Sequence, residues 1–600
     1  MDLTQGIEEL IENDVPDFEM SKLFKQYISE YKEGLNELFE ANQGKDFLVR
    51  HTKKLDHIIK MIYKVVLRKC FNDYIPLRNN IPVCFVALGS YGREQLCVHS
   101  DIDLMIVYEE SEGFNTQHII EKFLYLVWDA GLKLGHRVHE LKDLEAASNE
   151  DITIKTALSE SRLITGSNFL WMRTTRELNR IRHFEQKEFI LAKMDEAGHR
   201  RTKFPTSMQP NIKESVGGLR DSNLLFWILH SLYGVSSVKD LSSSLFSEEE
   251  YKEYRVALEL LYRVRSALHL IAHKQQDVLV LEYIPEVTKK LGFSSQRILV
   301  TKTMQAMWTI NHFTQIYTYK LTRPFIYEKK NLSLLRGNRK HDGFYELDNM
   351  IFVSFHAKSI KRRQFLTFLV SLEDKELHFD PSVYKLINSQ TMQGSLDAQE
   401  HDLMLKLYSR RYLHSILQFF FDAGILAHMI PPFSKVMFLP QFDGYHTHPV
   451  DIHSIMCIKA LENIQDPLAL ELYKSFSHEE RTLLHMTTLL HDTGKGRVQD
   501  HSLVGAKLFH AYAAKFDISP ELIEIGTRLI KHHIAMSRVA FREDFYHEKV
   551  LFAFISKIQD EQTLKLLFVL TYADINGVSL QTYNSFNAKL LRELYYASLE

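Results

Sequence analysis

The chain has 600 residues and a nearly balanced charge, with 73 Lys and Arg against 76 Asp and Glu. Hydrophobic cores stop growing near roughly 250–300 residues, so this length predicts three or four domains. The charge balance argues against a protein whose main task is to coat nucleic acid, and 45% hydrophobic with 25% charged residues excludes extensive disorder. Only 14 prolines and 24 glycines interrupt the chain, which predicts a mainly helical fold.

The cysteines and the terminal sequence indicate a cellular location. Four scattered cysteines show no CxxC spacing, so neither disulfides nor cysteine-based zinc sites are expected. The acidic start of the chain lacks the basic and then apolar pattern of a signal peptide. The longest apolar stretch, residues 415–433, is interrupted and falls short of the ~18 apolar residues of a membrane span. We therefore expect a cytoplasmic protein.

Hydrophobic periodicity divides the chain. Apolar residues recur every three or four positions before residue 75, again from 166 to 330, and after about 400, which predicts helices there. Apolar runs near residues 83 and 102 predict two strands, and alternation over Phe344–Phe355 predicts a small hairpin around Asp348-Asn349. We expect a mainly α protein with a small α/β domain and an all-α C-terminal domain. The expected segments are 1–75, 76–165, 166–330, 331–440 and 441–600.

The first group of chemically informative residues lies in the predicted α/β domain. A buried strand ends in Gly89-Ser90, and a second strand opens with Asp101 and Asp103. Side chains two positions apart on a strand project from the same face, about 6–7 Å apart. Two such carboxylates can bind Mg²⁺ ions that also hold triphosphate oxygens, while Gly89 and Ser90 approach the phosphates. Metal clamping of this kind suits nucleotidyl transfer.

This Gly-Ser and Asp-x-Asp pattern resembles the signature of the DNA polymerase β-like nucleotidyltransferase superfamily. The resemblance implies an α/β nucleotidyltransferase domain over residues 76–165 and a third carboxylate from a later strand. Glu160 is the best match for that carboxylate, and Asp151 is its competitor. The implied role of Glu160 is to position a metal or to take the proton of the acceptor hydroxyl.

A second unusual segment runs from Gln209 to Asp221 and contains Gly217-Gly218. A Gly-Gly turn before a periodic helix suits a loop that holds an anion through backbone amides, Lys213 and Arg220. The string resembles the loop after the nucleotidyltransferase domain in the family of bacterial PII uridylyltransferase/uridylyl-removing enzymes. The resemblance implies that Lys213 or Arg220 touches nucleotide or orders the wall of the active site.

A third group of residues is rich in histidine and aspartate, which are ligands for divalent transition metals. Its order resembles the HD phosphohydrolase superfamily, and the resemblance makes residues 441–600 an HD domain. The implied primary metal ligands are His453, His491, Asp492 and Asp574.

Further residues near this group extend the expected site. A second metal can recruit His501 and one of His532 and His533; we take His532. Consecutive helical residues diverge by about 100°, so both histidines of the pair are not expected at one ion. Lys495 is a candidate electrostatic partner of a phosphate oxygen, with capping of a helix end as the alternative.

All three groups occur in the order found in PII uridylyltransferase/uridylyl-removing enzymes, and the resemblance covers roughly residues 80–600. It implies transfer of UMP from UTP to a tyrosine of the signalling protein PII, with Mg²⁺ at the first site. It also implies hydrolysis of the UMP–protein bond at an HD site that holds Mn²⁺, Zn²⁺ or Fe²⁺. Residues 166–330 become the helical PII-uridylyltransferase-type domain. The ACT domains that sense glutamine in that family find no counterpart within these residues, so glutamine control is not supported.

Other functions remain open at this stage. A tRNA nucleotidyltransferase-like enzyme joins related domains, although the near-neutral charge disfavours RNA binding. A regulatory binding protein with one decayed active site is a second alternative. An HD hydrolase of the guanosine tetraphosphate type needs no Asp-x-Asp site upstream. We expect UTP and PII as partners, and neither membrane nor nucleic acid.

Overall fold

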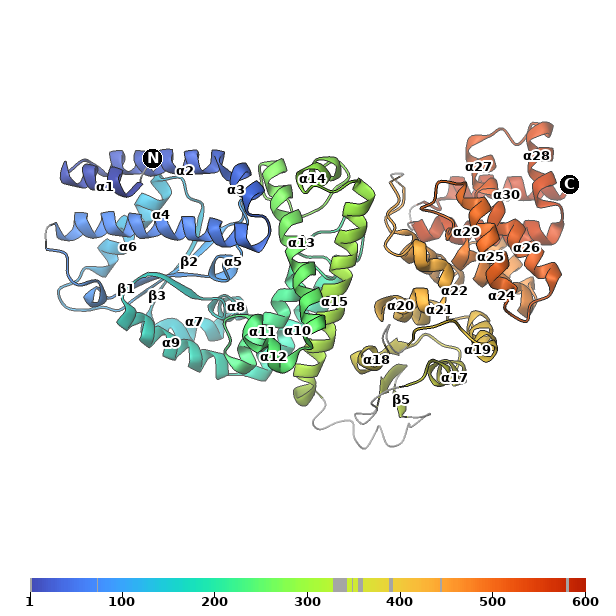
Figure 1. The fold of residues 1–600 in the computed structure, drawn as a ribbon, viewed down its shortest axis with the longest axis horizontal. Coiled ribbons are helices and arrows are strands. Elements are labelled where there is room, and N and C mark those ends of the chain that lie inside the picture. The colour runs from blue at the N-terminus through green and yellow to red at the C-terminus, as the bar shows by residue number, and fades with distance from the viewer. Residues whose placement is uncertain are drawn as a thin grey trace. The chain divides into compact units, whose positions relative to one another are not determined.

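The computed structural model describes residues 3–72, 74–326, 343–347, 349–353, 360–387, 392–442, 445–578 and 582–600. The chain divides into two compact units (Figure 1). The first comprises Met1–Pro205 and Pro210–Thr322, and the second comprises Thr206–Gln209 and Arg323–Glu600. The first holds a mixed four-stranded sheet among helices, and the second is almost entirely helical. This architecture confirms the expected mainly α fold with a small α/β domain.

The sheet of the first unit has the strand order β3-β2-β1-β4. Strands β2 and β3 pair in parallel, whereas β1 pairs antiparallel with both β2 and β4. The two expected strands are β1 and β2. The strand bounds are β1 Val83–Ala87, β2 Ile102–Tyr108, β3 Leu134–Glu140 and β4 Arg162–Gly166.

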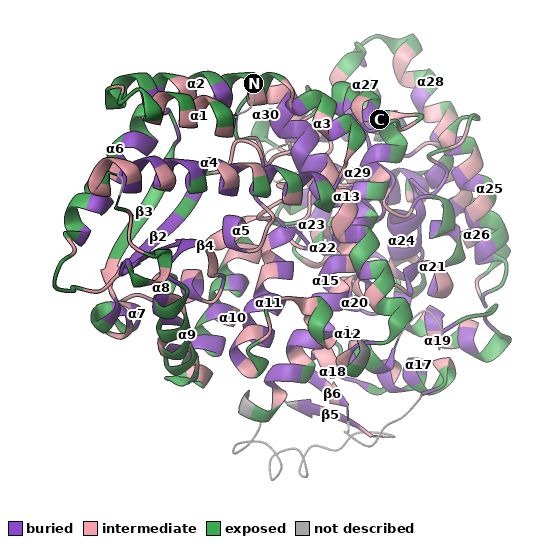
Figure 2. Cartoon of the chain, turned by 60° about the vertical axis from the view of Figure 1, so that its left-hand side comes forward, coloured by how far each residue is buried: buried purple, intermediate pink, exposed green. Residues whose placement is uncertain are grey.

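Both faces of this sheet are covered by helices, which explains the continuous apolar runs of its inner strands. Val83 and Phe85 of β1 pack with helices α1, α2, α4 and α6. Cys84 and Val86 point the other way and pack with helices α7–α9 (Figure 1). The edge strand β3 is largely exposed (Figure 2).

Helices make up the rest of the first unit. Those that accompany the sheet are α1 Leu3–Glu12, α2 Asp17–Glu33, α3 Leu35–Ala41, α4 Lys45–Phe71, α5 Gly89–Gly92, α6 Thr116–Asp129, α7 Leu144–Glu150, α8 Ile152–Leu158 and α9 Asn168–His183. Those that follow the sheet are α10 Gln186–Lys203, α11 Leu219–Tyr233, α12 Ser242–Leu245, α13 Glu248–Ala272, α14 Ile284–Lys290 and α15 Gln296–Ile326.

The second unit contains a small sheet of order β5-β6-β7. Its strands are β5 Phe344–Leu347, β6 Met350–Val353 and β7 His378–Phe379. The antiparallel β5–β6 pair lies where the hairpin is expected, and Asn349 between the strands has a φ of 66°. Asp348 and Phe355 of the expected hairpin lie outside the described residues. Strand β7 joins β6 in parallel and was not expected.

The remaining elements of the second unit are helices, and none of the helices in the described part of either unit is long and apolar enough to cross a membrane. Their bounds are α17 Arg362–Ser371, α18 Pro381–Leu386, α19 Ala398–Tyr408, α20 His414–Asp422, α21 Leu426–Met429, α22 Val450–Glu462, α23 Pro467–Ser475, α24 His478–Leu490, α25 His501–Ala513, α26 Pro520–Lys531, α27 Ala535–Arg542, α28 Glu548–Ile558, α29 Glu561–Val578 and α30 Ser585–Leu599.

An ion pair ties helix α4 to strand β4 beneath the first candidate site. Arg162 on β4 donates to both carboxylate oxygens of the buried Asp56, at 2.7 and 3.1 Å. The same guanidinium lies 5.6 Å from the ring centre of Tyr91, which is fully buried. Bidentate pairs of this kind fix both geometry and charge. The pair therefore anchors the start of β4, directly after Glu160.

Replacing this arginine tests the anchor. Arg162→Met leaves Asp56 buried without its cation, so we expect the free energy of unfolding of the first unit to fall by about 2–4 kcal/mol. Arg173→Met, which breaks an exposed pair with Glu109, is the matched control and should cost under about 1 kcal/mol. Urea denaturation followed by tryptophan fluorescence reports on this unit alone, because all four tryptophans lie before residue 323. Equal losses in the two variants would refute the anchoring role.

Candidate active sites

Two acidic side chains of the first candidate site lie at the start of β2. Asp101 precedes the strand and Asp103 is its second residue, so both project from one face into solvent. Loss of water around the Asp103 carboxyl group, together with repulsion from Asp101 and Glu160, raises the pKa of Asp103. The raised pKa therefore reflects first the partial burial of the Asp103 carboxyl group and then its closeness to two other carboxylates.

Two glycines leave space on either side of the Asp103 carboxylate. A Cβ atom at Gly89, whose φ is 58°, would lie 3.0 Å from Asp103 Oδ2. A Cβ atom at Gly135 on β3 would lie 3.0 Å from Asp103 Oδ1. Gly89 and the half-buried Ser90 open the single-turn helix α5. The backbone at both glycines can therefore lie close to the Asp103 carboxylate without a side chain in between. This closeness is what a phosphate-binding site requires.

The structure brings the expected third carboxylate to the same place. Glu160 lies in the turn between α8 and β4 and is buried. A Cβ atom at Gly89 would lie 3.7 Å from its Oε2 atom. Its Oε1 atom accepts hydrogen bonds from Arg93 and, at 2.5 Å, from the indole Nε1 of Trp227. The competitor, Asp151, instead caps helix α8 by accepting from Thr153.

The Gly-Gly loop lies near these acids and is held in a fixed shape. Asp221 is fully buried, accepts a hydrogen bond from the Gly217 amide at 2.7 Å and pairs with Arg200. Lys213 is near enough to Asp103 for its charge to oppose the rise of the Asp103 pKa. Arg220 lies 5.9 Å from the ring centre of Trp227, so it contacts the residue that holds Glu160. Both cations thus border the carboxylate cluster.

Three carboxylates with neighbouring cations suit a divalent ion and a polyphosphate. Oxygen ligands are the preference of Mg²⁺, which usually shares its coordination between one or two carboxylates and substrate phosphates. The donor set of Asp101, Asp103 and Glu160 fits this requirement. Arg93 and Trp227 were not assigned a role from the sequence; Arg93 stands inside the Gly-Ser motif, whereas no pattern signals Trp227.

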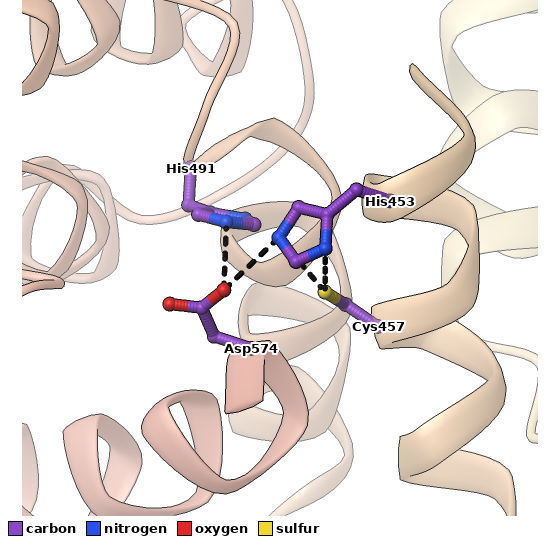
Figure 3. Close-up of side chains that lie close together, drawn as sticks. All are labelled: His453, Cys457, His491 and Asp574. Atoms are coloured by element: carbon purple, nitrogen blue, oxygen red, sulfur yellow. Dashed lines mark hydrogen bonds and ion pairs between the residues drawn. The ribbon is translucent and has the colours of Figure 1, made fainter. Parts of the chain in front are cut away.

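The second candidate site joins three helices of the second unit (Figure 3). His453 lies on α22, His491 and Asp492 follow the end of α24, and Asp574 lies on α29. Asp574 Oδ1 is 3.0 Å from His453 Nε2 and 3.5 Å from His491 Nε2. Asp492 Oδ2 is 3.4 Å from His491 Nε2. All four residues expected as primary metal ligands therefore lie together.

Hydrogen bonds to backbone carbonyls orient two imidazoles as ligands. His491 Nδ1 lies 2.7 Å from the Thr488 carbonyl oxygen, and His533 Nδ1 lies 2.7 Å from that of Ile530. A carbonyl only accepts, so Nδ1 carries the proton and the Nε2 lone pair is left for a metal. The buried atoms His491 Nε2 and Asp492 Oδ1 make no hydrogen bond within the described part of the chain. Unsatisfied buried atoms of this kind fit a bound cation.

Electrostatics in this cluster favour positive charge. Burial alone lowers the pKa of His491, but the charges of Asp492 and Asp574 outweigh burial and raise the pKa to about 10. Burial raises the pKa of both carboxyl groups, yet the adjacent His491 holds each well below its usual range. The cluster therefore stabilises a cation between two carboxylates, which is the property that a metal site needs.

Two further expected residues lie beside this cluster. Lys495 Nζ is 2.6 Å from Asp492 Oδ2 and 2.5 Å from Gln441 Oε1, so it faces the cluster. The ring of His501 lies 5.5 Å from that of His533.

The choice of His532 over His533 needs correction. His533 is buried, and its Nε2 lies 3.6 Å from Asp492 Oδ1. His532 is partly exposed beside the positive charges of Lys531 and Lys557. The two imidazoles diverge, as consecutive residues at a helix end do, and only His533 joins the cluster.

One neighbour of the cluster had no assigned role from the sequence. Cys457 lies one helical turn after His453, and its Sγ is 3.6 Å from His453 Nε2 (Figure 3). The spacing His453-x-x-x-Cys457 places both side chains on one helix face and was available as a signal.

Family models match three segments of the chain in order. A putative nucleotidyltransferase model, DUF294, matches residues 33–137. A GlnD PII-uridylyltransferase model matches residues 188–318, and an HD domain model matches residues 450–575. These segments contain, respectively, the Asp-x-Asp pair, the Gly-Gly loop and the His/Asp cluster.

Curated relatives cover nearly the whole chain. A protein of Novosphingobium aromaticivorans is 29% identical over 94% of this chain, and one of Azospirillum brasilense is 30% identical over 94%. A protein of Bradyrhizobium diazoefficiens is 28% identical over 93%. The chain spans 63%, 63% and 64% of the length of these relatives. Each is named a bifunctional uridylyltransferase/uridylyl-removing enzyme, and the chain is therefore similar to such enzymes over almost all of its residues.

Proposed function

We propose that this protein is a bifunctional enzyme that transfers UMP from UTP to a tyrosine of PII and hydrolyses the resulting UMP–protein bond. The observation that carries the proposal is the presence, in one chain, of a three-carboxylate cluster and a separate His/Asp cluster. Each cluster lies within or beside a segment matched by the corresponding family model. The choice of uridine is supported by the names of the relatives, and the choice of PII by the description of the matched family model. A cytoplasmic location accords with these substrates.

In the transfer reaction, the tyrosine oxygen attacks the α-phosphorus of UTP and its hydroxyl proton passes to solvent, while the bond to the β-phosphate breaks and pyrophosphate leaves. Mg²⁺ held by Asp101 and Asp103 would neutralise triphosphate charge. Because Glu160 Oε1 already accepts two hydrogen bonds, Oε2 is the oxygen left to face Gly89 and Asp103. We therefore assign Glu160 to positioning rather than to proton removal. Gly89 and Ser90 bring backbone to the phosphates, and Lys213 or Arg220 compensates their charge.

In the removal reaction, water attacks the phosphorus, and the tyrosine oxygen leaves and takes up a proton. A divalent transition metal, Mn²⁺, Zn²⁺ or Fe²⁺, held by His453, His491, Asp492 and Asp574 would polarise the phosphodiester and activate water. Lys495, held by Asp492, presents its ammonium group to the phosphate oxygens. His501 and His533 line the same side of the cluster and suit a second ion.

Variants at one site should affect only one reaction. We expect Asp101→Asn or Asp103→Asn to lower UMP transfer at least about a hundredfold, because each removes a charged metal ligand, and to leave removal intact. His491→Ala should do the reverse. Label transfer from UTP to purified PII, and release from labelled PII, measure the two reactions. Loss of both reactions in every variant, or of neither, would show that the two-site assignment is wrong.

The indole that holds Glu160 offers a finer test. Trp227→Phe keeps the ring but removes the donor, so Glu160 loses one of its two hydrogen bonds. We expect transfer to fall about tenfold, the effect of one lost hydrogen bond to a charged group. Trp128→Phe, an exposed position on α6, is the control. Normal UMP transfer by Trp227→Phe would show that positioning of Glu160 has no part in the mechanism.

Zinc or manganese ions should stabilise the second unit. At a concentration of 100 Kd, a ligand that binds only the folded state adds about 2.7 kcal/mol. Calorimetry detects this as a rise in the Tm of the second unit. Because that unit has no tryptophan, its transition is the one that tryptophan fluorescence does not follow. His491→Ala should abolish the rise, and the exposed control His510→Ala should keep it. An unchanged rise in His491→Ala would exclude this metal site.

A further inference from the structure

Cys457 lies close to the donor atoms of the His/Asp cluster although the HD resemblance assigns it no role. Donor atoms of His453, Cys457, His491 and Asp574 all lie within 4.8 Å of one another. The four side chains come from three chain segments and converge on a common centre (Figure 3). We infer that the Cys457 thiolate is a direct ligand of the ion held by His453, His491 and Asp574. This inference rests on the metal part of the proposed function.

Three of the distances between donor atoms are close to those expected around one divalent ion. Bonds of about 2.0 Å to nitrogen and about 2.3 Å to sulfur separate the two donors by roughly 3.5 Å. Cys457 Sγ lies 3.6 Å from His453 Nε2 and 3.8 Å from Nδ1, so it lies beside the ring and turns toward Nε2 when both share an ion. Two oxygen or nitrogen donors at such an ion lie roughly 3.3 Å apart. Asp574 Oδ1 lies 3.0 and 3.5 Å from the two imidazole nitrogens. The cluster is thus spaced as a ligand set.

Packing holds the sulfur in this place. Cys457 is fully buried on α22, one turn after His453, and faces helix α29, which carries Asp574. A Cβ atom at Gly577 would lie 2.3 Å from the Cys457 sulfur. The missing Cβ therefore gives the sulfur its room against α29, where it lies beside both Gly577 and the ring of His453.

Charge balance also favours the thiolate. A buried divalent cation is stable only when nearby charges compensate it. Asp574 supplies one negative charge, and the charge of the other expected carboxylate ligand, Asp492, is already balanced by Lys495 at 2.6 Å. A metal-bound cysteine loses its thiol proton to solvent and supplies the second charge. The site with Cys457 then carries no net charge.

A thiolate among two imidazoles and a carboxylate changes the choice of metal. Sulfur ligands suit zinc and related ions, whereas Mg²⁺ prefers oxygen. The chain has no CxxC pattern, so this cysteine contributes to a metal site only through the fold. For this one residue the inference departs from the expectation that cysteines take no part in a zinc site.

Cobalt serves as the probe, because Co²⁺ bound to thiolate absorbs in the near ultraviolet and bound Co²⁺ also absorbs in the visible. We expect both absorptions when the full chain is titrated with Co²⁺. Cys457→Ser, which preserves the packing against Gly577, should keep the visible absorption and lose the thiolate absorption. Cys70→Ser removes the more accessible thiol of the first unit and should keep both. Circular dichroism verifies that the variants fold.

Zinc affinity gives a second measurement. Loss of an outer hydrogen-bond partner of a ligand costs about 10–100-fold in metal affinity, so loss of a direct ligand should lower Zn²⁺ affinity at least about tenfold in Cys457→Ser. Visible absorption without thiolate absorption in the wild-type chain, or thiolate absorption that persists in Cys457→Ser, would overturn the inference and leave the proposed metal site standing. Absence of all cobalt binding would overturn both.

Discussion

Repulsion between carboxylates that lie close together is the constraint on which both candidate sites depend. Asp103 and Glu160 lie beside one glycine in the first unit with Asp101 near them, and Asp492 and Asp574 flank one imidazole in the second. Such arrangements are stable only with positive charge nearby. The protein supplies part of this positive charge through its own cationic side chains, and a bound divalent ion suits the rest of it. Both proposed reactions act on phosphate, which brings still more negative charge to the same places.

The helical segments and two strands could be predicted because their signal is local. β1 and most of β2 are covered on both faces, and their sequences are accordingly apolar except for Asp103 near the start of β2. Strand β3 was not predicted, because its exposed edge position places residues such as His136 and Arg137 where a buried strand has apolar side chains. The short β7 has two residues and owes its conformation to pairing with β6. Tertiary pairing, rather than local preference, defines both.

The residues of the candidate sites also fall into those that local sequence motifs identify and those that depend on tertiary contacts. Motif order was enough to name His453, His491, Asp492 and Asp574, which do lie together. It could not choose between His532 and His533, since the choice depends on where helix α26 ends and how the next turn faces. Contacts across long separations, such as Trp227 with Glu160, leave no trace in a single sequence. They arise only when helix α11 comes to lie beside the turn that carries Glu160.

The register of β2 against β3 has a consequence for folding fidelity. In the observed pairing, Gly135 lies opposite Asp103, and a side chain there would crowd the carboxylate. A slip by one residue would set Leu134 or His136 at that point and turn every β3 side chain to the opposite face. Since β3 is exposed, few buried contacts oppose such a slip. A chain with the slipped pairing would have a side chain beside Asp103 and could not bind an ion there. The single glycine therefore separates the register that can bind the ion from the one that cannot.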